Sequence, residues 1–213
     1  MGARMGVYLF DFDGTLVDSM PTYIAVMLRV LDENGISYGE DIVKTVTPLG
    51  YKGTAEYYQK LGVRMSVEEI LARFDAYAKK EYTENVQAKV SVKEVLTQMK
   101  ARGDRLNVLT ASPHAMLDPC LCRLGMYELF DNVWSCDDFN TTKANPEIYK
   151  MAAEKIGAPV KEIIFLDDNF NALKTAKTAG MRVFGVYDAS SENYKEEIKG
   201  ITERYIEDFS QLI

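Results

Sequence analysis

The segment LFDFDGTLVDS, residues 9–19, decides the fold prediction because it joins an apolar run to two closely spaced aspartates. The run Val7–Phe10 is short and continuously apolar, which is typical of a strand buried in a parallel sheet. Asp11 and Asp13 follow it directly. Since ligands of open α/β sheets bind outside the carboxyl ends of the strands, this position favours a functional role for the two acids.

Further apolar runs recur downstream and alternate with helical patterns. The strand-like runs are Leu106–Leu109, Ile163–Leu166 and Val183–Val186, with a weaker one around Val133. The helical faces between them consist of Val92, Val95, Leu96 and Met99, and of Ile148, Met151, Ala152 and Ile156. Strands separated by segments of helix length predict β-α-β units, and therefore an α/β fold with a parallel sheet.

This alternation is interrupted after the first strand. From Met20 to about Glu84 the periodicity is helical, and a capping box from Ser66 to Glu69 predicts the start of one helix. We therefore expect residues 17–85 to form an all-helical insert, and residues 1–16 and 86–213 to form the α/β core.

Composition limits the functional classes. The chain of 213 residues has a formal net charge of −7 and no cluster of Lys and Arg, which argues against nucleic-acid binding. No apolar stretch approaches the roughly 20 residues of a membrane helix, and the early first strand leaves no room for a signal peptide. The chain has three cysteines, and a small, odd number of cysteines argues against a disulfide scaffold. We expect a cytoplasmic protein that is a monomer or a weak dimer.

Polar side chains stand at the ends of several predicted strands. Thr110 ends one run, Asp167 and Asp168 end another, and Lys143 lies between the weak strand and the next helix. Because the carboxyl ends of parallel strands share one edge of the sheet, we expect these residues to meet Asp11 and Asp13.

Structural roles for these residues are the alternative. A single aspartate after a strand is commonly a helix cap or a turn former, and Asp167 and Asp168 allow that role. A calcium loop is rejected because Leu16 and Thr22 occupy the positions of its glycine and glutamate. His114, the single histidine, follows a proline and has no acid partner evident in the sequence, which favours a solvated or capping role.

Charge balance favours a magnesium site. Carboxylates from two strand ends repel one another unless a cation enters, and hard oxygen ligands with open water positions suit Mg²⁺. The charges of Asp11, Asp167 and Asp168 are balanced by one Mg²⁺ and Lys143. Such a site can admit a phosphate group, and Asp13 can then serve as an acid.

Four segments now carry a resemblance to a known family. DFDGTLVDS (11–19) resembles the first signature of the haloacid dehalogenase-like superfamily. VLTAS (108–112) resembles its second motif, TKANPEIY (142–149) its lysine motif, and FLDDNFNALKTAKTAG (165–180) its fourth, acidic motif. The insert matches the place and length of the family's helical cap. The resemblance implies a Rossmann-like parallel core with an all-helical cap domain inserted after the first strand.

The resemblance also implies an aspartyl-phosphate mechanism. Asp11 would be the nucleophile on phosphorus, and Asp13 would protonate the leaving group and later deprotonate the attacking water. Thr110, with Ala111 beside it, and Lys143 would bind the phosphoryl oxygens.

The metal ligands implied by the resemblance come from the first and fourth motifs. Asp11, Asp13 through its backbone carbonyl, Asp167 and Asp168 would hold Mg²⁺. The fourth motif often reads G-D-S-x-x-D, and this chain has Asp167 at the glycine position and Ala172 at the last aspartate. The double acid is a known form of the motif, and we favour Asp168 as the direct ligand.

Three functions are compatible with these motifs. The favoured one is a Mg²⁺-dependent phosphatase that hydrolyses a small phosphorylated metabolite. A phosphosugar mutase of the β-phosphoglucomutase type keeps the same core residues, whereas a catalytically silent binding protein would be expected to lack some of them. Dehalogenases lack the second acid, so Asp13 argues against that branch. We also expect Lys52, in the predicted turn TPLGYKG (47–53), to contact the substrate, although an ordinary exposed turn is the alternative.

Overall fold

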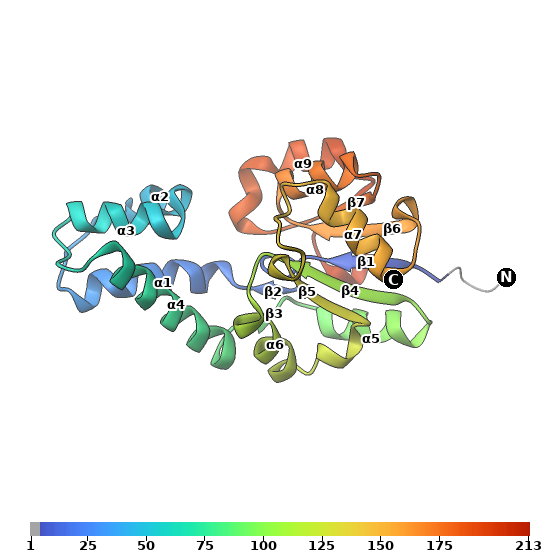
Figure 1. Cartoon of the computed structure of the whole chain (residues 1–213), viewed down its shortest axis with the longest axis horizontal. Coiled ribbons are helices and arrows are strands. Elements are labelled where there is room, and N and C mark those ends of the chain that lie inside the picture. The colour runs from blue at the N-terminus through green and yellow to red at the C-terminus, as the bar shows by residue number, and fades with distance from the viewer. Residues whose placement is uncertain (1–4) are drawn as a thin grey trace. The chain divides into compact units, whose positions relative to one another are not determined.

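The chain forms two compact units. The computed structural model describes residues 5–213, apart from the side chain of Pro48. The core unit contains the residues up to Asp18 together with Gln87–Ile213, and the inserted unit contains Ser19–Val86. Figure 1 shows the elements of both units along the chain. Within the described range, no helix has the length and apolar character needed to cross a membrane.

A parallel sheet forms the centre of the core unit. Among the described residues its six strands are β1 (Val7–Phe10), β4 (Arg105–Thr110), β5 (Asn132–Ser135), β6 (Ile163–Asp167), β7 (Arg182–Val186) and β8 (Arg204–Ile206). Their order is β5-β4-β1-β6-β7-β8, and every neighbouring pair is parallel. This sheet confirms the predicted α/β fold class. Strand β8 was not predicted, because its three residues form no continuous apolar run.

The first strand lies in the interior of this sheet, between β4 and β6. Leu9 of β1 is paired with Asn107 on one side and Phe165 on the other. Leu9 and Phe10 are completely buried, which explains the continuously apolar sequence of this strand. The segment that follows β1 therefore emerges in the middle of the carboxyl edge of the sheet.

Helices cover the two faces of the sheet. They are α5 (Val92–Ala101), α6 (His114–Arg123), α7 (Glu147–Ile156), α8 (Phe170–Thr178) and α9 (Lys195–Ile201). Figure 1 shows α7, α8 and α9 on one face and α5 and α6 on the other. One hydrophobic cluster joins α7, α8 and α9 to the sheet. It includes Leu9, Leu109, Ile148, Phe165, Leu173, Val183 and Ile198. The predicted face of α5, formed by Val92, Val95, Leu96 and Met99, is also buried.

The inserted unit is helical throughout its regular structure. It contains α1 (Met20–Glu33), α2 (Ile42–Val46), α3 (Gly50–Lys60) and α4 (Val67–Glu84). The predicted capping box begins α4: the Glu69 amide donates to Ser66 Oγ over 3.1 Å, and the Ser66 amide donates to Glu69 Oε2 over 2.7 Å. The expected turn at residues 47–53 is wrong in its extent. Thr47–Leu49 form a 3₁₀ helix and α3 begins at Gly50, so Lys52 lies in the first turn of a helix.

The chain leaves and re-enters the core unit at neighbouring residues. β2 (Val17–Asp18) and β3 (Gln87–Ala88) form an antiparallel pair in which Val17 lies opposite Ala88 and Asp18 opposite Gln87. The two connections to the inserted unit therefore start from one small ribbon.

Candidate active site

The segment after β1 makes a tight turn beneath the carboxyl edge of the sheet. The Asp11 amide donates to the carbonyl oxygen of Leu166 over 2.8 Å, which continues the β1–β6 pairing by one residue. Gly14 has a φ of +74°, and its amide donates to the carbonyl of Val17 over 3.0 Å. A Cβ atom at Gly14 would lie 2.8 Å from the carboxylate of Asp168. Glycine is therefore required here both by the backbone and by the close approach of an acid.

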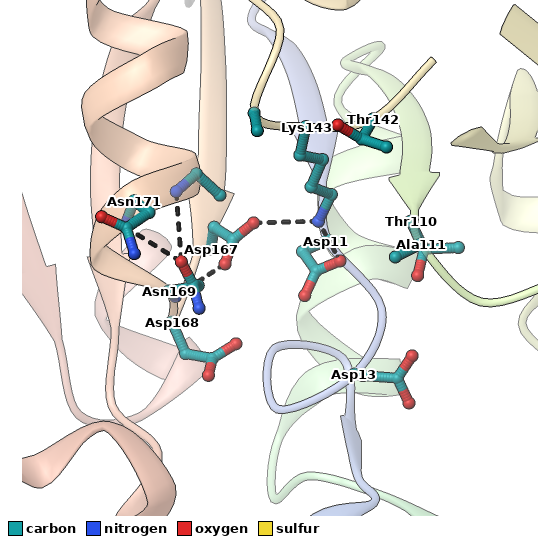
Figure 2. Close-up of a pocket in the computed structure, with 12 residues that line it drawn as sticks. Asp11, Asp13, Thr110, Ala111, Thr142, Lys143, Asp167, Asp168, Asn169 and Asn171 are labelled. Atoms are coloured by element: carbon teal, nitrogen blue, oxygen red, sulfur yellow. Dashed lines mark hydrogen bonds and ion pairs between the residues drawn. The ribbon is translucent and has the colours of Figure 1, made fainter. Parts of the chain in front are cut away.

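A pocket opens at this edge of the sheet, and its volume is about 400 Å³. Figure 2 shows the side chains that point into it from the ends of β1, β4 and β6. The lining residues are Asp11, Asp13, Thr110, Ala111, Thr142, Lys143, Ala144, Asp167, Asp168, Asn169, Asn171 and Ala172. The structure thus brings together every site residue that the sequence predicts in the core. Lys52 lies in the inserted unit, exposed on α3.

Three carboxylates meet within this pocket. One oxygen from each of Asp11, Asp167 and Asp168 lies within 4.8 Å of the others. Their exposed fractions are 6%, 1% and 8%. Burial, together with the charges of the neighbouring acids, raises the pKa of Asp11 well above its ordinary range and raises the pKa of Asp168 to about 7. A set of buried, mutually repelling oxygen donors fits a hard divalent cation such as Mg²⁺.

Lys143 supplies the positive charge in the same pocket. Its ammonium donates to Asp11 and, over 2.9 Å, to Oδ2 of Asp167. Although burial lowers the pKa of Lys143, the charges of these two carboxylates raise it overall. The phenolic oxygen of Tyr149 lies 3.2 Å from the carbonyl oxygen of Lys143 and supports its backbone. Lys143 is therefore a cation held between two acids, and its charge offsets part of the negative charge of the three carboxylates.

Asp13 is held apart from the three-carboxylate group. Figure 2 shows its carboxylate pointing away from Asp168. The hydroxyl of Ser112 donates to Asp13 Oδ2 over 2.5 Å, and the Ser112 amide donates to Thr110 Oγ1 over 3.0 Å. Sequence reasoning missed Ser112, although its place two residues after Thr110 puts it in a loop at the same edge of the sheet.

Asp167 and Asp168 have different surroundings. Asp167 uses both oxygens within the protein, because Oδ2 accepts from Lys143 and Oδ1 accepts from the Asn169 amide over 2.7 Å. Asp168 is held by two hydroxyl groups: Thr15 Oγ1 donates to Oδ1 over 3.3 Å, and Ser191 Oγ donates to Oδ2 over 3.0 Å. Both hydroxyl donors were missed by sequence reasoning: Thr15 lies inside the first motif but was given no role, and Ser191 lies outside all four motifs.

His114 has two acid partners that were not evident from the sequence. Its Nδ1 lies 2.8 Å from Asp118 Oδ1, and its Nε2 lies 2.8 Å from Asp138 Oδ2. Asp118 is one helical turn away on α6, whereas Asp138 is brought close only by the fold, from the 3₁₀ helix Cys136–Phe139 after β5. His114 therefore joins the start of α6 to the segment that leads to Lys143.

Comparisons with known proteins agree with this architecture. The family model for haloacid dehalogenase-like hydrolases matches residues 8–186. A phosphorylated carbohydrates phosphatase of Thermotoga maritima is 27% identical over 184 residues, which cover 85% of each chain. A phosphoglycolate phosphatase of Yersinia pseudotuberculosis is 29% identical over 194 residues, which cover 89% of this chain and 83% of the relative.

Solved structures share the fold at lower identity. A structure from Thermotoga maritima described as a putative β-phosphoglucomutase has a TM-score of 0.84 at 22% identity, covering 98% of this chain and 96% of the other. The HAD-hydrolase YfnB of Bacillus subtilis, described as bound to magnesium, has a TM-score of 0.83 at 13% identity, covering 99% and 97%. At these identities the likeness shows the fold alone.

Proposed function

Because this chain belongs to the haloacid dehalogenase-like hydrolase family, we propose that it is a Mg²⁺-dependent phosphatase that hydrolyses a small phosphorylated metabolite. The observation that carries the proposal is the joint presence, in one pocket, of Lys143, three clustered carboxylates and the separately held Asp13. The curated relatives described above are phosphatases of phosphorylated carbohydrates and of phosphoglycolate, which supports hydrolysis of phosphate esters.

Asp11 is the proposed nucleophile. One of its carboxylate oxygens attacks phosphorus, the ester P–O bond breaks, and Asp13 gives a proton to the leaving alkoxide. Asp13 then takes a proton from a water molecule whose oxygen attacks the phosphorus, and the bond between Asp11 and phosphorus breaks to release inorganic phosphate. Splitting the displacement into two steps lets one acid act as nucleophile and the other move the proton.

Lys143, Thr110 and Ala111 are the proposed phosphate-binding residues. The ammonium of Lys143 already lies among anionic oxygens, and the same charge would stabilise the phosphoryl oxygens as negative charge develops on them. Thr110 is buried at the end of β4, and its hydroxyl is fixed by the Ser112 amide. These groups are held by strand ends and short loops, so they need little reorganisation when a phosphate enters.

The proposed Mg²⁺ ligands are Asp11, the backbone carbonyl of Asp13, and Asp168, with Asp167 beside them. Asp168 is preferred to Asp167 as the direct ligand because Asp167 already forms an ion pair with Lys143, whereas the two partners of Asp168 are neutral hydroxyl groups. When bound, Mg²⁺ supplies a Lewis acid that offsets the charge of the phosphoryl group.

The inserted unit is proposed to act as a helical cap that selects the substrate. Lys52 is its proposed substrate contact, because its ammonium is exposed on α3 and can pair with a carboxylate or hydroxyl of the metabolite. Lys52→Met is expected to raise KM several-fold at nearly constant kcat, since uniform substrate binding is lost. Equal KM values for the two proteins would remove Lys52 from the site.

Phosphate release from an aryl phosphate and a metabolite panel tests the proposed function. Wild type, Asp11→Asn and Asp41→Asn are compared with and without Mg²⁺, where Asp41 is an exposed acid of the inserted unit that serves as the matched control. Activity is expected only with Mg²⁺ and only in the wild type and the control. Turnover by Asp11→Asn would refute the nucleophile, and equal turnover in chelator would refute the cofactor. Conversion of β-glucose 1-phosphate into glucose 6-phosphate without phosphate release would instead identify a mutase.

A further inference from the structure

Lys89, which is not among the residues that line the pocket, makes three hydrogen bonds through its ammonium group. It follows β3 directly, and its side chain is 20% exposed. Its ammonium donates to the carbonyl oxygen of Gly14 over 2.6 Å, to the carbonyl of Tyr187, and to Oδ2 of Asp188 over 3.0 Å. Its backbone amide donates to the carbonyl of Leu16 over 3.0 Å. All three ammonium hydrogens thus have acceptors, and the proposed chemistry uses none of them.

The two segments that Lys89 joins meet again at Asp168. The segment after β1 provides the Thr15 hydroxyl to one oxygen of Asp168, and the segment after β7 provides the Ser191 hydroxyl to the other. Asp188 also organises the second segment, because its Oδ1 accepts from the Ser190 amide over 2.9 Å at the start of the 3₁₀ helix that contains Ser191. Lys89 therefore links the segment after β1 to the segment after β7, and these two segments supply the hydroxyl donors of the Asp168 carboxylate.

We propose that Lys89 is a positioning residue of the metal site, and that its ion pair with Asp188 keeps Thr15 and Ser191 in place so that Asp168 is correctly oriented toward Mg²⁺. This inference rests on the proposed function, because Mg²⁺ is the ion proposed at this site. Groups that orient metal ligands from outside the coordination shell commonly change metal affinity or activity by 10–100-fold when removed. The Lys89–Asp188 pair is largely buried, so its geometry is tightly held.

Positioning and simple charge make opposite predictions for Lys89. Removing a positive charge near a cation site would strengthen Mg²⁺ binding if electrostatic attraction alone decided the affinity. Releasing the two segments that hold Asp168 would weaken binding, because a disordered ligand must be ordered again when the ion enters. The sign of the change in Mg²⁺ affinity therefore separates the two roles.

Calorimetric titration with MgCl₂, in the absence of substrate, is the decisive measurement. Lys89→Met is expected to weaken Mg²⁺ binding about 10-fold or more. Lys89→Arg is expected to lie between Lys89→Met and wild type, because it keeps the charge but its planar fork cannot reach the same three oxygens. Lys93→Met, a matched change at an exposed lysine of α5, is expected to leave the Kd unchanged. Unchanged or stronger Mg²⁺ binding by Lys89→Met would overturn the proposal.

Asp188→Asn tests the same ion pair from its other side. Loss of a negative charge near a cation site also weakens Mg²⁺ binding by itself, so the double variant carries this test. Asp188→Asn is expected to weaken Mg²⁺ binding. The double variant Lys89→Met/Asp188→Asn is expected to have a Kd for Mg²⁺ close to that of the single variant that binds more weakly, because both changes break the same interaction. Effects that multiply independently would contradict the proposed pair. If circular dichroism shows that Lys89→Met does not fold, Lys89→Arg decides, because it keeps the charge: weaker Mg²⁺ binding supports positioning, and a wild-type Kd in that variant overturns the inference. Failure of the wild type to bind Mg²⁺ would refute the proposed cofactor itself, which is a different result.

Discussion

The hydroxyl of Ser112 lies 2.5 Å from Oδ2 of Asp13 and links the segment after β4 to the segment after β1. A hydroxyl that donates to one carboxylate oxygen fixes the direction of the other. Ser112 therefore orients the carboxylate of Asp13, the proposed proton-transfer group, although Ser112 itself transfers no proton in the proposed reaction.

Ser112→Ala is expected to lower kcat about 10-fold, since a hydrogen bond to a charged group contributes roughly 1.5–3 kcal/mol. The loss should appear in kcat rather than in Mg²⁺ affinity, because the carboxylate of Asp13 lies outside the three-carboxylate group. Steady-state kinetics with an aryl phosphate provide the measurement, and Ser112→Thr, which keeps the hydroxyl, is the control. A wild-type kcat in Ser112→Ala would show that Asp13 is oriented by other contacts.

Asp168→Asn is expected to stabilise the metal-free protein while weakening Mg²⁺ binding. Burial and the charge of Asp167 raise the pKa of Asp168 to about 7, so its ionised form is unfavourable in the folded chain at pH 8. A neutral amide removes that cost, on the order of 1–3 kcal/mol. Urea unfolding at pH 8 in chelator should show the gain, and unfolding in excess Mg²⁺ should reverse the ranking because only the wild type gains full ligand stabilisation. A less stable metal-free variant would contradict the prediction.

His114 is expected to make stability depend on pH. Hydrogen bonds to Asp118 and then to Asp138 raise the pKa of His114 above its ordinary value of 6.5. Both ring nitrogens face carboxylates, and only the doubly protonated ring can donate to both. Because the folded pKa is the higher one, the stabilisation is fully present below about pH 6.5 and is lost as the pH rises through the folded pKa.

The measurement for His114 compares wild type with His114→Gln. The side chain is 39% exposed, so solvent screening limits the effect to about 0.5–1 kcal/mol. The difference in free energy of unfolding between the two proteins should be largest near pH 6 and should shrink at pH 9. A difference that is constant with pH would mean that the imidazolium is not the species that bridges the two acids.

Gly14→Ala is expected to impair Mg²⁺ binding more than backbone strain alone explains. Gly14 has a φ of +74° and Gly157 has a φ of +71°, but only an added Cβ at Gly14 meets an obstacle, the Asp168 carboxylate at 2.8 Å. Gly157→Ala therefore serves as the control for strain, which costs about 1 kcal/mol. Both variants should lose stability, and only Gly14→Ala should bind Mg²⁺ more weakly in calorimetry. Equal Mg²⁺ affinities would show that the Asp168 carboxylate moves aside freely.

The sequence predicts the features that depend on periodicity and topology. The apolar runs identify β1, β4, β6 and β7 because fully buried parallel strands have no polar face. The meeting of Asp11, Lys143 and Asp167 follows from the same rule, since the carboxyl ends of parallel strands share one edge. A residue placed immediately after a strand is therefore located by the fold class alone.

The features missed from the sequence depend on loop conformation. Ser112 reaches Asp13 across 99 positions of sequence, and Lys89 reaches Asp188 across the same separation. Serine and lysine are common in loops, so neither residue type indicates a partner. His114 illustrates the same limit, because its contact with Asp138 exists only once the segment after β5 has folded beside α6. Side-chain contacts between loops require the structure.

The β2–β3 ribbon has a consequence for how such a chain can change over time. Because Val17 pairs with Ala88 and Asp18 pairs with Gln87, the ends of the inserted unit are adjacent. A module with adjacent ends can be lengthened, shortened or exchanged without altering the register of the parallel sheet, and closing the gap that it leaves costs little chain entropy. The ribbon is therefore a point at which the inserted unit can vary while the sheet and the pocket of the core unit stay unchanged.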